Sequence, residues 1–224
     1  MLAVYAHPDD PEVASAGTLA RWAREGSEVH VLICTLGEKG TSDPDMDPAE
    51  LAARRRIETA EACALVGASS HANLGYPDGE FANDGESRGR IVERIRLLRP
   101  SVVMTSDPTA VLFGNSYVNH SDHRAVGFAV LDSCAPEAAR PHYFPSAGPP
   151  HQVESVFLSG TLEPDTWVDI TSTIEVKVAA LGCHSSQLGA DAETMAGLVR
   201  DRAAHAGTDH DMAYAEAFRV MRLA

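Results

Sequence analysis

The sequence predicts an α/β fold, a Rossmann-like open sheet that is mostly parallel and carries helices on both faces. Short apolar runs alternate with segments of helical pattern, which favours parallel strands joined by crossover helices. A chain of 224 residues with 44% hydrophobic residues can bury a sizeable core, and no internal repeat or domain boundary interrupts the pattern. We therefore expect one domain that spans residues 1–224.

Each apolar run in the first half predicts a strand with a helix after it. Asp10 before Pro11 suits a helix start, because proline lacks the N–H group that a first turn leaves unpaired. Gly26 ends that helix, residues 47–50 (DPAE) form a second start with a capping-box pattern, and Pro100 ends a third helix. The expected order is strand 2–5, helix 13–24, strand 28–34, helix 47–66, strand 72–74, helix 87–98 and strand 101–105.

The second half is less regular. We expect a helix from about Asp122, strands at 155–158 and 167–170, and helices through most of the remainder. Residues 136–152 (PEAARPHYFPSAGPPHQ) are long and proline-rich, and we interpret them as an insertion or lid rather than a linker.

Composition restricts the partners. The net charge of −14 disfavours nucleic acid, because neutralising phosphates requires lysine and arginine. No apolar run reaches membrane-spanning length and no signal peptide is visible, so we expect a cytoplasmic protein with no membrane partner. The cysteines form no CxxC pair, which favours buried thiols in a reducing compartment. Homo-oligomerisation is left open.

A first cluster of polar residues, AHPDDPE at 6–12, directly follows the first predicted strand. Acids this close repel one another unless a cation or proton lies among them. Open α/β sheets bind ligands beyond the carboxyl ends of their strands, and no glycine-rich phosphate motif follows this one. The cluster therefore predicts a metal cation.

A second cluster, NHSDH at 119–123, follows another strand of the same predicted sheet. His7, Asp10 and one histidine of this cluster would form a two-histidine, one-carboxylate set, which suits catalytic Zn²⁺ and also Fe²⁺ or another divalent metal. His7 and Asp10 are three residues apart across a turn and can converge on one ion. The adjacent Asp9 must diverge, which leaves it free to act as a base on metal-bound water.

These clusters belong to a longer series of motifs. AHPDDPE…GT, TLGEKG, RRIE, GYPDG and HSDH, in this order over most of residues 3–127, resemble the motifs of the PIG-L (LmbE-like) zinc-dependent N-acetylglucosamine deacetylases, whose members include mycothiol- and bacillithiol-pathway deacetylases. KVAALGCHSSQ and AEAFR near the end also resemble this family. The AHPDD and HxDH pair is the specific part, because RxxE and PDG are common on their own.

The resemblance implies a set of zinc ligands and a base. The ligands are His7, Asp10 and His123, and the general base is Asp9. A proline separates the acid pair from Glu12, which we therefore expect to be structural or to lie behind the ligands.

Four further roles follow from the resemblance. His120 would stabilise the oxyanion or protonate the leaving amine, with Asp122 setting its charge and orientation. Arg55 and Asp78 fall where relatives hold the hydroxyls or the far half of the substrate. Ser121 replaces the usual proline of HPDH without removing a functional group.

Four other polar residues have weaker signals. We interpret Glu38 and Glu58 as structural, whereas His184 and Gln187 either approach the site or pack in the core.

The implied function is a metal-dependent hydrolase that cleaves the N-acyl (acetyl) amide of an amino sugar or its conjugate. Direct attack by metal-bound water would release a free amine and a carboxylate. Three alternatives stay open: a non-catalytic metal- or sugar-binding module, an amidase of mycothiol S-conjugates, and a phosphoacceptor receiver-like domain. Asp9 and His120 argue against the binding module, and 224 residues are too many for a receiver. The expected partner is a small-molecule N-acyl amino sugar or conjugate.

Overall fold

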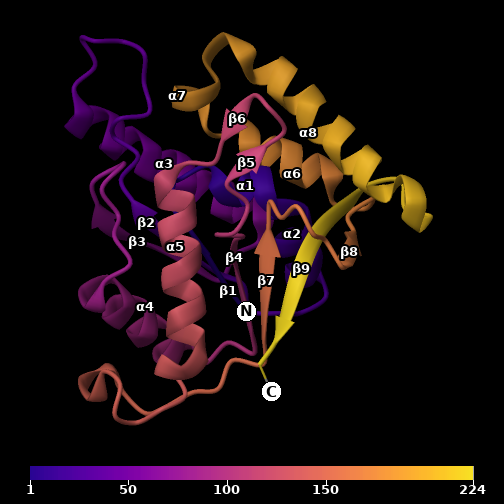
Figure 1. The fold of residues 1–224 in the computed structure, drawn as a ribbon. Helices are drawn as coiled ribbons and strands as arrows, with labels where there is room; N and C mark the ends of the chain where they lie inside the picture. Colours follow the sequence, from indigo (N-terminus) through magenta and orange to yellow (C-terminus); the bar gives the residue numbers. More distant parts are fainter. Residues whose placement is uncertain (224) are drawn as a thin grey trace.

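The computed structural model describes residues 1–223, the side chain of Ala190 excepted. A seven-stranded sheet crosses the molecule in the order β3-β2-β1-β4-β7-β9-β8 (Figure 1). The five strands β3, β2, β1, β4 and β7 are parallel to one another. Strand β9 runs antiparallel to both of its neighbours, β7 and β8. The strands are β1 (Leu2–Tyr5), β2 (His30–Thr35), β3 (Ser70–Tyr76), β4 (Val102–Ser106), β7 (Ser155–Ser159), β8 (Thr166–Asp169) and β9 (Ala215–Arg222). The predicted, mostly parallel α/β fold is confirmed.

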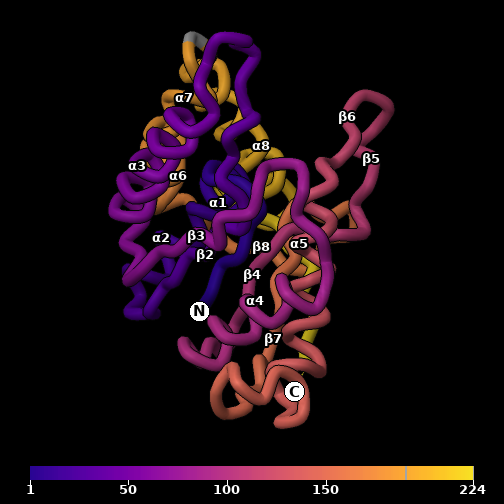
Figure 2. Tube along the Cα trace, turned by 90° about the vertical axis from the view of Figure 1, so that its left-hand side faces the viewer, coloured from indigo at the N-terminus to yellow at the C-terminus, as the bar shows by residue number. Residues whose placement is uncertain are grey.

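Helices cover both faces of the sheet, as Figures 1 and 2 show from two sides. One face carries α2 (Ala16–Arg24), α3 (Pro48–Val66), α6 (Ile174–Gly182) and α8 (Ala192–Gly207), and the other carries α4 (Gly85–Leu98) and α5 (Ser121–Asp132). The short helices α1 (Asp10–Ala14) and α7 (Ser185–Leu188) complete the set near the site described below. Among residues 1–223, no helix combines the length and the apolar composition needed to cross a membrane.

The central strand β1 explains why both faces need a cover. Successive side chains of a strand point to opposite faces, so Leu2 and Val4 join the core beneath α4 and α5, while Ala3 and Tyr5 join the core beneath α2, α3 and α6. All four side chains are buried. A strand buried on both faces has a continuous apolar sequence, and the run LAVY of β1 predicts such a strand.

The first predicted helix is divided in two. Ser15 has a non-helical backbone (φ −149°, ψ 5°) between α1 and α2. The carboxylate of Glu216, on β9, accepts hydrogen bonds from the backbone N–H groups of Gly17 (3.0 Å) and Thr18 (2.7 Å). The second helix therefore begins with its own cap, supplied by a residue 199 positions away from Gly17.

Two further elements differ from the expectation. Between the predicted strand at 101–105 and the predicted helix at Asp122, the structure contains a hairpin of β5 (Leu112–Phe113) and β6 (Tyr117–Val118). The last expected helix gives way to β9, which lies between β7 and β8. Both strands of the hairpin are only two residues long, and β9 mixes apolar and charged residues, so neither gave a clear sequence signal.

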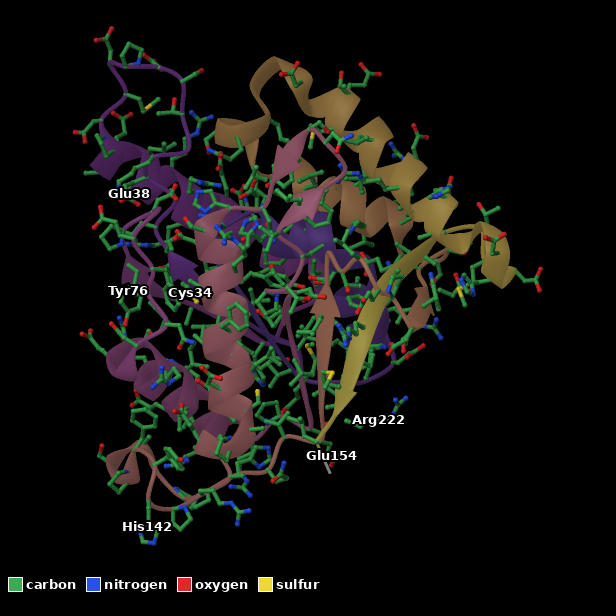
Figure 3. All side chains as sticks on the ribbon, viewed as in Figure 1. Cys34, Glu38, Tyr76, His142, Glu154 and Arg222 are labelled. Atoms are coloured by element: carbon green, nitrogen blue, oxygen red, sulfur yellow. The ribbon has the colours of Figure 1, made fainter. Side chains whose placement is uncertain are left out.

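Residues 136–152 lie at the amino-terminal edge of the sheet. The buried guanidinium of Arg96, on α4, donates hydrogen bonds to six backbone carbonyls of residues 137–148, at 2.8–3.2 Å. His142, in this segment, lies at the bottom of Figure 3, whereas Glu38, beside the site, lies in its upper part. Arg96 therefore ties the segment to α4, and its role as an insertion or lid stays a prediction.

The Arg96 contacts predict a stability effect without a direct effect on activity. Replacing Arg96 by Met leaves several buried carbonyls unpaired, so we expect the free energy of unfolding to fall by about 3 kcal/mol or more. Arg94→Met is the matched control, because Arg94 lies on the same helix and makes no side-chain hydrogen bond within residues 1–223. Urea denaturation followed by circular dichroism measures both. Equal midpoints for the two variants would contradict the assigned role.

Candidate active site

The two polar clusters predicted from the sequence meet at the carboxyl end of β1. His7 follows β1, Asp10 begins α1, and His123 lies in the first turn of α5. His7 Nδ1 lies 3.1 Å from His123 Nε2 and 3.4 Å from Asp10 Oδ2, and His123 Nε2 lies 3.0 Å from Asp10 Oδ1. Three atoms that can donate electron pairs to a cation therefore converge on one point.

A hydrogen bond to Asn119 sets the ring orientation of His123. Its Nδ1 lies 2.9 Å from the amide oxygen of Asn119, one helical turn earlier. Because an amide oxygen only accepts, Nδ1 carries the hydrogen and Nε2 presents its lone pair to the site. No role of Asn119 was predicted from the sequence, although its spacing of four residues from His123 in NHSDH is the pattern of neighbours on one helix face.

The ring of His7 is held in the same way by two carboxylates. Its Nε2 lies 3.1 Å from Asp78 Oδ1 and 3.4 Å from Asp122 Oδ2, which leaves Nδ1 for the site. Asp78 is buried and its carboxylate contacts His7, and its predicted contact with substrate stays a prediction. The carboxylate of Asp122 accepts a hydrogen bond from Gly79 N (2.7 Å) and faces His7, and its predicted effect on the charge and orientation of His120 stays a prediction.

The electrostatics of these residues favour positive charge. Burial alone would lower the pKa of His7, but hydrogen bonds to Asp10, Asp122 and Asp78 raise it to about 12. The pKa of Asp10 is well below its usual value, because His123 and His7 outweigh the effect of burial, and Asp10 in turn raises the pKa of His123. A buried pocket that draws protons this strongly fits a divalent cation bound by His7, Asp10 and His123.

Asp9 points away from these three residues. Its Oδ1 accepts a hydrogen bond of 2.7 Å from Arg55 on α3, and 27% of its side chain is exposed. Arg55 is 2% exposed and also donates to the carbonyl of Gly37 at 2.8 Å. The guanidinium of Arg55 thus lies between two acceptors and contacts Asp9, while its predicted contact with substrate stays a prediction.

The backbone at Gly37 explains why the TLGEKG motif has a glycine at this position. Its φ of +67° favours glycine, and a Cβ atom there would collide with the guanidinium of Arg55. The adjacent Glu38 accepts hydrogen bonds from the backbone N–H of Asp78, 3.1 Å from each carboxylate oxygen. This loop therefore positions both Arg55 and Asp78, and Glu38 has the structural role expected from the sequence.

His120 caps helix α5. Its Nδ1 accepts a hydrogen bond of 3.2 Å from Asp122 N, and its ring meets that of His7 edge-on at 4.7 Å between centroids. Partial burial, and then the charge of His7, lower its pKa. His7, His120 and Asp122 also form a cation-sized cluster, but it uses the face of His7 already bonded to carboxylates. We therefore favour the cluster that contains Asp10.

The C-terminal motif HSSQ supports the site from outside. His184 Nε2 lies 3.1 Å from the buried carboxylate of Glu12, and Gln187 donates to the carbonyl of Gly40 at 2.9 Å. Glu58 accepts from both serines of the motif, at 2.6–3.0 Å. Glu12 and Glu58 are thus structural, as expected, while Gln187 both packs and lines a cavity at the site.

That cavity has a volume of about 410 Å³ and is lined by all of the predicted catalytic, metal-binding and substrate-binding residues except Asp122. Its walls include His7, Asp9, Asp10, Arg55, Asp78, His120 and His123. Buried carboxylates, imidazoles and an open volume of this size suit hydrolysis of a small polar substrate.

Comparison with known proteins agrees with this geometry. The family model for GlcNAc-PI de-N-acetylase (PIG-L) matches residues 2–134, which contain all eight predicted site residues. The chain belongs to the PIG-L family. The C-terminal HSSQ and AEAFR motifs lie beyond the matched region, yet they contact α1, α2 and α3 within it.

Individual relatives have related names. The chain is 32% identical over 226 residues to diacetylchitobiose deacetylase of Thermococcus kodakarensis, covering 99% of this chain and 82% of the relative. It is 35% identical over 178 residues to 1D-myo-inositol 2-acetamido-2-deoxy-α-D-glucopyranoside deacetylase 2 of Saccharopolyspora erythraea, covering 69% and 62%. The structure of N,N′-diacetylchitobiose deacetylase from Pyrococcus horikoshii superposes with a TM-score of 0.90 at 31% identity, covering 99% and 83%.

The convergence of three donor atoms predicts a metal-binding phenotype. His123→Ala removes one of them, so we expect less than about one tenth of the divalent metal that the parent protein retains after dialysis. His142→Ala, at the far end of the molecule, is the control and should keep the parental content. Elemental analysis measures both. Full occupancy in His123→Ala would exclude this residue as a ligand.

Proposed function

We propose that this protein is a metal-dependent N-deacetylase that hydrolyses the N-acyl amide of an amino sugar or its conjugate to a free amine and a carboxylate. One observation carries the proposal: the His7–Asp10–His123 cluster and the Asp9 carboxylate share one open cavity. Membership of the PIG-L family and relatives named as deacetylases of acetamido sugars support it.

In this proposal His7, Asp10 and His123 hold the metal, with Zn²⁺ as the first candidate and Fe²⁺ or another divalent ion as the alternative. A divalent ion there supplies Lewis acidity, which polarises an amide carbonyl and makes water more acidic. Asp78 and Asp122 keep Nδ1 of His7 turned toward the ion by accepting from its Nε2.

Asp9 is proposed as the general base. The bond from Arg55 fixes Oδ1, and Oδ2 is left to accept a proton from the attacking water. Arg55 is then a positioning residue, since its guanidinium reaches the reaction only through Asp9. Asp9 later returns a proton to the products.

His120 is proposed to interact with the substrate after attack. Its ring lies at the cavity wall beside His7, and Nε2 is free to donate toward the developing oxyanion or the leaving amine. The same site would serve an amidase of larger conjugates, and substrate trials separate these two activities.

The free cysteines, three of them buried, support the reducing, cytoplasmic compartment expected from the sequence.

Asp9→Asn should separate catalysis from metal binding. The amide keeps the size of the side chain but is a poor proton acceptor, so we expect turnover to fall by about 100- to 10,000-fold while metal content is unchanged. Asp45→Asn, in the exposed loop before α3, is the control. Parental activity in Asp9→Asn would show that Asp9 is not the base.

The reaction itself can be tested with N,N′-diacetylchitobiose and other N-acetylglucosaminyl compounds. We expect amine and acetate in equal amounts, activity lost with a chelator, and activity restored by Zn²⁺ or Fe²⁺. Release of free sugar or phosphate instead would overturn the deacetylase proposal.

A further inference from the structure

A second cavity of about 420 Å³ adjoins the first one. The two share Asp10, Val13, Tyr117 and His123, but Asp9 lines only the first. A substrate whose amide lies at Asp10 and His123 can therefore extend into both cavities. Neither the family match nor the predicted roles give the second cavity an occupant.

Three elements far apart in the sequence build this second cavity. The β5–β6 hairpin contributes Phe113 and Tyr117, whose ring centroids lie 5.9 Å apart, the end of β4 contributes Ser106, and α8 contributes Arg202. Figure 1 shows the hairpin and α8 above the carboxyl end of β7. The volume is several times what an acetyl methyl group needs, so the cavity fits a larger part of a substrate.

Most polar groups around the second cavity already have partners. Asn119 donates to the carbonyl of Ala110 (2.8 Å) and contacts His123. Ser159 lies between the carbonyl of Thr105 and the hydroxyl of Tyr5, each at 3.1 Å. Among the charged residues that line the cavity, Arg202 is then the one whose side chain is left for a ligand.

Arg202 makes no ion pair within the described residues 1–223. Two positions earlier on the same helix, Arg200 contacts Glu175 at 2.7 Å. A guanidinium binds carboxylate and phosphate through two parallel hydrogen bonds, and Arg202 is exposed at the edge of the cavity, where such a group can reach it. In a chain of net charge −14, Arg202 places a cation in the cavity that Asp10 and His123 also line.

We propose that the second cavity binds an anionic group of the substrate, a carboxylate or phosphate, through Arg202. The inference rests on the proposed function and narrows its substrate class to N-acyl amino sugars that carry an acidic group. That group reaches Arg202 either from the sugar side, as a phosphate or acid on the aglycone, or from the acyl side, as the free end of a dicarboxylic acyl chain.

Three probes distinguish these sources on the Zn²⁺-loaded full chain: the neutral methyl glycoside of N-acetylglucosamine, N-acetylglucosamine 1-phosphate, and N-succinylglucosamine. We expect kcat/KM for one anionic probe to exceed that for the neutral probe by about tenfold or more, through a lower KM. Arg202→Gln should remove that preference and change the neutral probe less than twofold. Arg200→Gln, the matched control, should leave all values unchanged.

Preference for the phosphate assigns the cavity to the sugar side, and preference for the succinyl compound assigns it to the acyl side. Equal rates for all probes, or a preference that survives Arg202→Gln, overturn the proposal. Titration calorimetry of the same probes on Asp9→Asn provides a readout that needs no turnover. Arg202-dependent binding without hydrolysis in the parent would keep the anion site and overturn the deacetylase function, and binding independent of Arg202 would overturn the anion site.

Discussion

The two-sided hydrogen bonding of His7 is the constraint on which the site depends. One ring nitrogen faces Asp10 and His123, and the other faces Asp78 and Asp122. These carboxylates would repel one another without the positive charge that they share, which is why the pKa of His7 is raised to about 12 despite its burial. Removing any one of them would change the orientation of the ring as well as the charge of the pocket, so binding of a cation and local order are coupled.

Hydrogen bonds between the loops around this ring hold them in place, in addition to their attachment to the sheet. Arg55 joins Asp9 to Gly37, the adjacent Glu38 holds the backbone of Asp78, and the next residue after Asp78 donates to Asp122. Behind them a buried pair of Lys177 and Glu216 (2.6 Å) fastens the start of α2 to β9. Hydrogen bonds thus join motifs as far as 199 residues apart, and the C-terminal segment holds the helices beside the site although it carries none of the proposed catalytic groups.

The reaction proposed here needs a proton acceptor and a cation close together but not paired with each other. The backbone achieves this because adjacent side chains diverge: Asp10 turns toward the two histidines, and Asp9 turns toward Arg55. The two cavities then meet at Asp10 and His123, so an amide held there has space on both sides.

The sequence by itself determined the elements whose signals are local. Three such signals lie within a few residues each and could be predicted without a structure. They are the apolar run of β1, the Asp47 cap of α3 and the spacing of His7 and Asp10. The tertiary structure alone decided the partners of Arg55 and Asp78, the cap that Glu216 gives α2, and the position of β9. Each of these joins residues from 46 to 199 positions apart or depends on strand order, and sequence spacing carries no information about which distant backbone will lie nearby.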